Sequence, residues 1–162
     1  NMENIGRILG KEQEVAQHLA EIDAAIERVK RLSDNQVAFV GLVTGGRVST
    51  YGPGSRYGIF YDAFGFLPVD ARIESSTHGQ TISFEFILVY NPDVIFVIDR
   101  DAAIGAEGAQ PAKAVIENAL VRETNAYKYG RIVYLDPYLW YLSGGGLASV
   151  KAMIAEIEAA LR

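Results

Sequence analysis

Cysteine is absent from this 162-residue sequence, and histidine occurs only twice. The absence of cysteine excludes a disulfide framework and thiolate metal sites. The chain also has no excess of positive charge, because its formal net charge is −5 at pH 7. A nucleic-acid partner is therefore not expected, since phosphate backbones are bound by surfaces with a net positive charge.

Long apolar runs are also missing. Val94-Ile95-Phe96-Val97-Ile98 is among the longest uninterrupted apolar stretches, whereas a membrane-spanning helix needs about 20 such residues. We expect a globular chain instead, since 162 residues with 49% hydrophobic content can bury a single-domain core. The opening Asn-Met leads us to expect that the chain is part of a longer protein.

Three familiar catalytic or phosphate-binding motifs are missing as well. No Gly-Lys-Ser/Thr follows the glycines at 45–46 or 52–54, no Gly-x-Gly-x-x-Gly follows a strand, and no Gly-x-Ser-x-Gly is present. Enzymatic activity is therefore not expected. One alternative stays open, namely an α/β enzyme that uses Asp99 or Asp101 as an acid or base at a strand end.

Apolar residues recur at steps of three, four and seven from Ile5 to Val29. This spacing predicts one long amphipathic helix over residues 4–32. At ~1.5 Å per residue it would extend ~43 Å, about the length of a whole domain of this size. A helix of that length usually spans two bodies, although it could also pack along a single lobe.

Strand and helix patterns alternate after residue 34. We predict strands over 36–43, 93–98 and 131–135, and helices over 55–64, 83–90, 109–119, 121–127 and 147–161, with 44–54 as a Gly-rich loop. This alternation predicts an α/β fold, a three-layer Rossmann-like lobe with a mostly parallel central sheet.

Polar and aromatic residues are found where the predicted strands end. They are Arg56, Arg100, Tyr138, Trp140 and Tyr141. Because the carboxyl ends of parallel strands share one edge, we expect these residues and the loop residue His78 to converge on one cleft. Guanidinium groups bind anions, and phenolate oxygen can ligate a transition metal. Such a cleft suits an anion with aromatic or metal character.

Alternative roles remain open for His78 and for the residues at the strand ends. His78 lies in the polar loop Thr77-His78-Gly79, and a lone loop histidine is more often incidental than a ligand, although its companions here favour a ligand. Trp140 and the tyrosines could instead cap the core. In that case the arginines would pair with nearby carboxylates, of which the candidates are Asp99, Asp101 and Asp136.

Several motifs together resemble a known family. They are Gly-Pro-Gly-Ser-Arg-Tyr-Gly (52–58), Thr-His-Gly (77–79), Ser-Phe-Glu-Phe-Ile-Leu followed by Asn-Pro-Asp (83–93), Val-Ile-Asp-Arg (97–100), and Leu-Asp-Pro followed by Trp-Tyr-Leu (135–142). With the long first helix, they resemble the siderophore-binding proteins of bacterial ABC iron importers. The nearest group looks like the periplasmic ferric catecholate binders of the Campylobacter enterobactin-binding type and their Vibrio counterparts.

This resemblance covers essentially the whole chain and implies its organisation. Residues 1–34 would form the inter-lobe backbone helix, and residues 35–162 the C-terminal lobe of a two-lobe protein whose N-terminal lobe is absent. Two of the three arginines that face the anionic iron complex in this family match Arg56 and Arg100, and the third would belong to the missing lobe. Tyr138 and Trp140 would line the same ligand site.

The resemblance also implies a metal role and a docking role. His78 and Tyr141 match a histidine and a tyrosine that complete the iron(III) shell when the siderophore offers only four oxygens. Glu85 matches the carboxylate with which the lobe docks on the permease.

The implied function is that of the substrate-binding component of an ABC transporter. It would bind a ferric catecholate siderophore, without any further cofactor, and deliver it to the inner-membrane permease. Its location would be the periplasm, or the outer face of the cytoplasmic membrane through a lipid anchor. The alternative is a binding protein of the same class for haem or cobalamin, although neutral cobalamin has little use for Arg56 and Arg100. We also expect the isolated lobe to self-associate through its exposed cleft face, the long helix, or both.

Overall fold

The computed structural model describes residues 2–8, 10–70 and 79–162. Six strands form one central sheet in the described part: β1 (Val37–Thr44), β2 (Arg47–Thr50), β3 (Leu67–Pro68), β4 (Gln80–Ile82), β5 (Val94–Asp99) and β6 (Ile132–Tyr134). Their order is β4-β2-β1-β5-β6, and β3 pairs with β1. β1 runs parallel to β3 and β5, and β5 parallel to β6, while β2 and β4 are antiparallel additions. The predicted α/β lobe with a mostly parallel sheet is confirmed.

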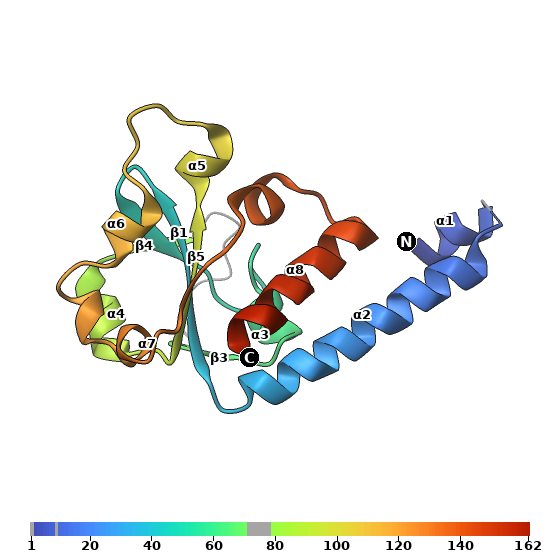
Figure 1. Cartoon of the computed structure of the whole chain (residues 1–162), viewed down its shortest axis with the longest axis horizontal. Helices are drawn as coiled ribbons and strands as arrows, with labels where there is room; N and C mark the ends of the chain where they lie inside the picture. The colour runs from blue at the N-terminus through green and yellow to red at the C-terminus, as the bar shows by residue number, and fades with distance from the viewer. Residues whose placement is uncertain (1, 9, 71–78) are drawn as a thin grey trace.

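Helices cover both faces of the sheet (Figure 1). The helical elements are α1 (Met2–Ile8), α2 (Glu12–Ser33), α3 (Ile59–Asp62), α4 (Phe84–Tyr90), α5 (Arg100–Ile104), α6 (Ala112–Ile116), η1 (Val121–Glu123), α7 (Asn125–Lys128), η2 (Tyr138–Leu142) and α8 (Leu147–Leu161). On one face lie α4, α6 and α7, and on the other lie α3, α8 and the C-terminal end of α2. These are the outer layers of the expected three-layer lobe.

Strand β5 shows why the lobe has two cores. Its residues Val94 to Ile98 are all buried, and successive side chains of a strand point to opposite faces. Phe96 therefore packs into the core beneath α3 and α8, whereas Ile95 and Val97 pack into the second core on the opposite face. The continuous apolar run is thus explained by cover on both sides.

The Asn-Pro-Asp break fixes the start of the parallel pair. Asn91 adopts a left-handed conformation with φ 45°, which ends α4. Its side-chain oxygen accepts a hydrogen bond from the Asn125 backbone N–H at 2.7 Å. Asp93 accepts one from the backbone N–H of Val37 at 2.8 Å. These contacts align the first residues of β5 with β1 and α7.

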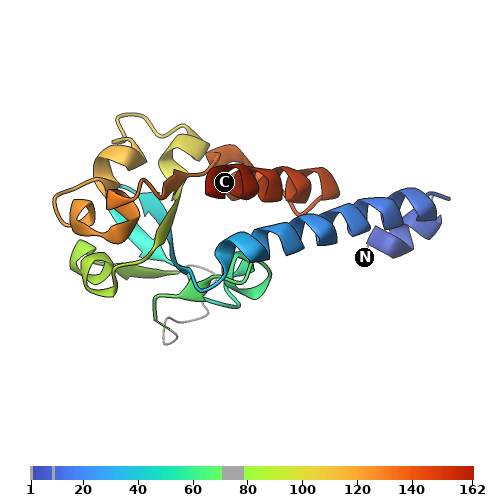
Figure 2. The ribbon, with the colours of Figure 1, turned by 60° about the horizontal axis from the view of Figure 1, so that its bottom comes forward.

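The first helix differs from the prediction. Instead of one helix over 4–32, the structure has α1 and α2, and between them Gly10 adopts φ 68°, a backbone conformation that ends a helix. Figure 2 shows α1 folded back beside the start of α2, and α2 extending beyond the sheet. The described residues of α2 are buried only from Ile22 onward. Residues 12–21 therefore contribute no buried side chain to the core of the lobe.

Residues 44–54 were predicted to form a loop, but they include strand β2. Gly45 and Gly46 have φ 56° and 75° and form a two-residue turn, after which β2 pairs antiparallel with β1. Such turns favour glycine because both central residues need positive φ. Strand β4 then adds to β2.

The helices over 83–90 and 147–161 are confirmed as α4 and α8, and other predicted helices are shorter. The helix predicted over 55–64 is reduced to α3, because residues 53–58 form tight turns. The one over 109–119 is reduced to α6, and 121–127 is divided between η1 and α7. Helix α5 was not predicted. It begins directly after β5, because Asp99 caps it by accepting from the Ala102 backbone N–H at 3.0 Å.

Candidate functional site

An open pocket of about 570 Å³ lies beside the carboxyl ends of β1 and β5. It is lined by Leu42, Thr44, Gly45, Arg47, Ser49, Tyr51, Arg56, Thr81, Arg100 and Tyr141. Three of these residues are arginines, and none is a carboxylate. The pocket is therefore a concentration of positive charge in a chain whose formal net charge is −5.

The floor of the pocket is one face of the β1-β2-β4 extension. Leu42 lies opposite Ser49, and Ser49 lies opposite Thr81, which makes one row across three strands. Thr44 and Arg47 form the next row, at the turn of the hairpin. Because side chains alternate along a strand, Arg47 and Ser49 share the pocket face while Val48 between them is buried in the opposite core.

Arg56, Arg100 and Tyr141 form the wall of the pocket. Nη2 of Arg56 donates to the backbone carbonyl of Tyr141 at 2.6 Å, and its guanidinium carbon lies 4.5 Å from the centre of the Tyr141 ring. Nε of Arg100 donates to the Tyr141 hydroxyl oxygen at 2.8 Å. The predicted convergence of the two arginines with Tyr141 is therefore present.

The arginines change the acidity of the phenol between them. The hydrogen bond from Arg100 is the largest cause that lowers the pKa of Tyr141, and the charge of Arg56 acts in the same direction. Both favour the phenolate, because a positive neighbour stabilises the charged form of an acid. Phenolate is the form that ligates a metal.

The alternative that the arginines pair with strand-end carboxylates is not supported. Asp99 accepts backbone N–H groups of Ala102 and Ala112, each at 3.0 Å. Asp101 is buried and accepts from the Gly45 backbone N–H at 2.7 Å. Asp136 accepts from two backbone N–H groups within η2. In the described ranges, neither Arg56 nor Arg100 forms an ion pair with a carboxylate.

The same contacts weigh against the enzyme alternative. Asp99 and Asp101 accept hydrogen bonds from backbone N–H groups. Neither side chain lines the arginine pocket. Among the described residues, no group of three or more His, Cys, Asp or Glu side chains could hold a metal ion.

The loop before α3 holds Arg56 in place. Gly54 has φ 73°, and its N–H donates to the Asp62 side chain at 2.8 Å. A Cβ at Gly58 would lie 2.7 Å from the Gly54 nitrogen, so only glycine allows the chain to fold back so closely. Arg56 therefore projects from a compact turn that is tied to α3.

Two tyrosines support Arg56 from the core side. The rings of Tyr51 and Tyr57 pack edge to face at 4.9 Å, and the Arg56 guanidinium carbon lies 5.1 Å from the Tyr57 ring centre. Burial raises the pKa of Tyr57 to about 12. Its hydroxyl is buried and has no hydrogen-bond partner within the described part of the chain. Burial also raises the pKa of Tyr51, so both tyrosines differ from Tyr141, whose pKa is lowered.

The structure corrects the predicted role of Trp140 in the ligand site. Its side chain is buried, stacks on Phe60 with ring centres 5.0 Å apart, and donates from Nε1 to Glu156 at 2.6 Å. It does not line the pocket, so it caps the core instead. Tyr138 is exposed and also lies outside the lining. In the π-helical turn η2, Tyr141 alone reaches the pocket.

Two further predicted residues lie outside this pocket. His78 falls within 71–78, outside the described residues. Glu85 lies in the first turn of α4, and its side chain is exposed. No described helix combines the length and the apolar character needed to cross a bilayer.

Arg47 was missed because the sequence 44–54 was interpreted as a loop. The signal was present, since Gly45-Gly46 stands between Val43-Thr44 and a run that contains the β-branched residues Val48 and Thr50, a pattern typical of a hairpin. A hairpin there would have placed Arg47 beside Thr44 at a strand end.

A match to a family model covers residues 1–139, and this family is described as periplasmic binding protein. The chain belongs to this family. The resemblance inferred from the motifs is therefore confirmed at the level of the family. The family is one of binding proteins, in agreement with the expectation that the chain is not an enzyme.

Two curated relatives of this periplasmic binding protein are similar over nearly its whole length. Petrobactin-binding protein YclQ of Bacillus subtilis (strain 168) is 46% identical over 158 residues, which cover 96% of this chain and 49% of the relative. Ferric-anguibactin-binding protein FatB of Vibrio anguillarum is 35% identical over 156 residues, which cover 95% and 48%. The chain thus spans about half the length of the curated relatives it matches.

Solved structures of the family have the same fold. The crystal structure of YclQ matches with a TM-score of 0.92 over 99% of this chain and 56% of that chain. The periplasmic catecholate-siderophore binding protein VctP of Vibrio cholerae matches with a TM-score of 0.89 and 32% identity, over 97% of this chain and 57% of that chain.

Proposed function

We propose that this chain binds an anionic ferric catecholate siderophore in the arginine pocket, as part of the substrate-binding component of an ABC iron importer. The observation that carries the proposal is the wall of the pocket, in which Arg56 and Arg100 contact Tyr141 and no carboxylate of the described residues pairs with them. Unpaired arginines around a phenol of lowered pKa suit a ligand that brings both negative charge and iron(III).

The charge of the ligand fits this wall. In a ferric tris-catecholate, the six negative charges of the catecholates exceed the three positive charges of iron, so the complex is a trianion. Guanidinium groups offer rigid, charge-assisted donors to catecholate oxygens. A neutral ligand such as cobalamin would leave the three arginines of the pocket without a counter-charge.

A tetradentate ligand would use Tyr141 in a second way. Two catecholates fill four of the six positions of an octahedral iron, and the phenolate of Tyr141 and the imidazole of His78 would fill the other two. The hydrogen bond from Arg100 already favours the phenolate. His78 immediately precedes Gly79, where an added Cβ would lie 2.7 Å from the ring of the pocket residue Tyr51.

The relatives support iron complexes as the ligand class. YclQ, FatB and VctP are named for petrobactin, ferric anguibactin and catecholate siderophores. We extend the catecholate type to this chain because its pocket is cationic and contains a phenol.

We further propose that the chain is one lobe of a two-lobe protein. Residues 1–34 would connect the lobes, and residues 35–162 would be the C-terminal lobe. Residues 12–21 of α2 extend beyond the sheet and belong to neither core (Figures 1 and 2), as expected of a connecting helix. The protein would work in the periplasm or be lipid-anchored outside the cytoplasmic membrane, and would deliver its cargo to a permease.

A ligand panel tests the ligand class. The 162-residue chain is titrated with a ferric tris-catecholate, haem and cobalamin, and the fluorescence of Trp140, its single tryptophan, is followed. We expect saturable quenching by the ferric catecholate at lower concentration than by either alternative. Tighter binding of cobalamin or haem would contradict the proposal.

Glu85 tests the proposed permease contact. A carboxylate on an exposed helix turn can pair with a permease arginine without touching the pocket. In the two-lobe protein, Glu85→Ala should leave the dissociation constant of the ferric siderophore unchanged while iron uptake falls. A parallel loss of binding and uptake would place Glu85 in the ligand site instead.

A further inference from the structure

Arg47 is the third arginine of the pocket, and the family resemblance gives it no role. It lies at the turn of the β1-β2 hairpin, is exposed, and shares the pocket face with Ser49. Within the described residues its guanidinium has no hydrogen-bond or ion-pair partner. Arg56 and Arg100, by contrast, already contact Tyr141. Arg47 therefore keeps all its N–H donors available to a ligand.

The backbone that carries Arg47 is held in place. The Gly45 N–H in the turn donates to the buried side chain of Asp101 at 2.7 Å. Asp101 directly follows Arg100 in α5, so the same short segment positions both arginines. Arg47 also pairs with Thr44 in the last register position of the hairpin. Its position in the pocket is thus set by the fold, although its side chain extends freely.

The floor beside Arg47 carries hydroxyl groups that are also available. Thr44, Ser49 and Thr81 line the pocket, and in the described part of the chain their side-chain hydroxyls have no hydrogen-bond partner. The pocket therefore has two chemically different sides. One side has Arg56, Arg100 and an aromatic phenol, whereas the other has Arg47 and three hydroxyls.

We propose that Arg47 and these hydroxyls form a second subsite, which takes a carboxylate on the chain that links the chelating groups of the ligand. This inference rests on the proposed function, because the first side is assigned to the iron-bound catecholates. A planar guanidinium binds a carboxylate through two parallel hydrogen bonds, and hydroxyls can donate to its remaining lone pairs.

Charge counting favours the carboxylate. A ferric bis-catecholate carries one negative charge, and the phenolate of Tyr141 adds a second. The three arginines of the pocket then leave one positive charge unmatched, and one carboxylate on the ligand supplies the missing negative charge.

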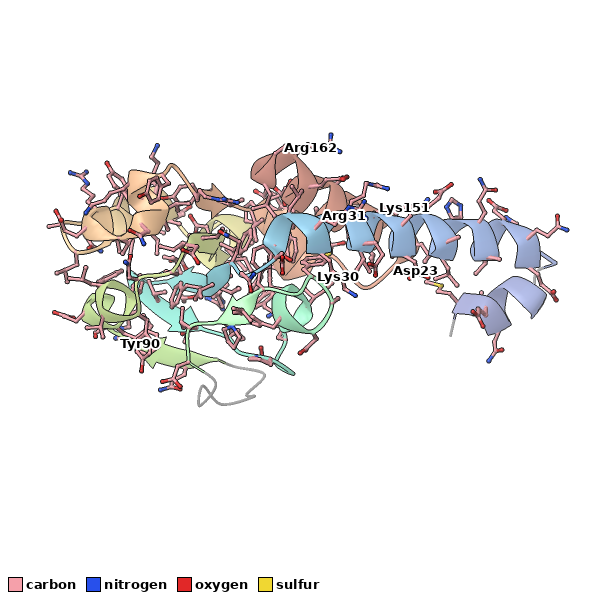
Figure 3. The ribbon with its side chains drawn as sticks, turned by 90° about the horizontal axis from the view of Figure 1, so that it is seen from below. Asp23, Lys30, Arg31, Tyr90, Lys151 and Arg162 are labelled. Carbon is pink, nitrogen blue, oxygen red and sulfur yellow. The ribbon has the colours of Figure 1, made fainter. Side chains whose placement is uncertain are left out.

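A pair of matched ligands tests the subsite. Two synthetic bis-catecholate chelators are made with the same linker, which bears a carboxylate in one and a primary carboxamide in the other. Their ferric complexes are titrated into the 162-residue chain, its Arg47→Ala and Arg56→Ala variants, and Arg31→Ala as a control. Arg31 is an exposed residue of α2 (Figure 3) and does not line the pocket.

The expected result is selective. Arg47→Ala should weaken binding of the carboxylate complex about tenfold, as expected for loss of one charge-assisted contact, and change binding of the carboxamide complex little. Arg56→Ala should weaken both complexes, and Arg31→Ala neither. An equal loss for both complexes in Arg47→Ala, or no loss for either, would overturn the second subsite while leaving the proposed function intact.

A different result would contradict the proposed function itself. If the parent chain bound neither ferric complex, the first side of the pocket would not be a catecholate site, and the second subsite would fail with it. Unchanged melting temperatures of the variants are the control for folding. Arg47→Lys should restore part of the affinity for the carboxylate complex, because a lysine keeps the charge but not the two parallel donors.

Discussion

The pocket and the α2–α8 interface use the same charged residue types in opposite ways. Between the helices each cation has a carboxylate, since Arg28 Nε lies 2.8 Å from Glu158 and Lys151 pairs with Glu21. Lys151 is labelled in Figure 3, where α8 and α2 lie together. In the pocket, Arg47, Arg56 and Arg100 have no carboxylate within the described residues. The ion pairs hold α2 and α8 together. The arginines of the pocket lack such carboxylate partners and can instead bind the negative charge of a ligand.

The core of the lobe and the pocket meet within η2. In η2 the side chain of Trp140 is buried against Phe60, and that of the next residue, Tyr141, faces the arginines. Substitutions can therefore distinguish residues that stabilise the lobe from residues that bind the ligand.

The largest expected effect is on stability. Trp140→Ala should lower the free energy of unfolding by about 3–5 kcal/mol, because it removes a large buried side chain and leaves Glu156 without its indole partner. Urea unfolding followed by circular dichroism measures this change. If the variant unfolds like the parent but no longer binds the ferric complex, Trp140 is part of the ligand site and this account of it is wrong.

The next effect is on affinity. Arg56→Ala and Arg100→Ala should each weaken binding of a ferric tris-catecholate about ten- to a hundredfold, since a charge-assisted contact is worth roughly 1.5–3 kcal/mol. The melting temperature should stay nearly constant. Isothermal titration and thermal unfolding on the same samples test this. A lower melting temperature with unchanged affinity would show that the arginines are structural.

Tyr141→Phe should have a selective effect. Binding of a tetradentate ferric bis-catecholate should weaken and its visible charge-transfer band should change, because a ligand of iron is lost, whereas a hexadentate tris-catecholate should be affected little. His78→Ala should behave alike. Binding of the bis-catecholate should weaken as pH falls, because protons compete with iron for the phenolate, whereas the hydrogen bond from Arg100 lowers the pKa of Tyr141 and opposes this protonation. Equal losses for both ligands would show that these residues only shape the pocket.

The smallest effect concerns the helix interface. Arg28 holds the pKa of Glu158 below its ordinary value of 4.5, so this pair stabilises the fold above that pH and its contribution is lost as pH falls through the lowered pKa. Arg28→Ala should destabilise by at most about 1 kcal/mol at neutral pH and leave ligand affinity unchanged. Urea unfolding at neutral and acid pH tests this, and an affinity loss would contradict the separation of the two regions.

The sequence predicted best what depends on buried periodic patterns. The run Val94–Ile98 indicated a strand covered on both faces, and residues 147–161 form the expected final helix. Arg56, Arg100 and Tyr141 were expected to converge because loops after parallel strands share an edge, and they do.

The missed features depend on backbone turns. The step of seven from Ile8 to Val15 kept the helical period while hiding Gly10, whose positive φ separates α1 from α2. In η2, sequence proximity alone could not show that Trp140 is buried while Tyr141 reaches the pocket. Arg47 was missed for a similar reason, because the register of the β1–β2 hairpin places it in the pocket.

The most direct test of the central claim compares ligands that differ mainly in charge. A ferric tris-catecholate is a trianion, whereas a ferric tris-hydroxamate is neutral because three singly charged hydroxamates balance the iron. The 162-residue chain is titrated with both at increasing salt concentration. We predict binding of the catecholate complex that weakens with salt, as screening of charges requires, and little binding of the hydroxamate complex. Equal affinity for the two complexes, or affinity independent of salt, would contradict a pocket whose unpaired arginines select an anionic iron complex.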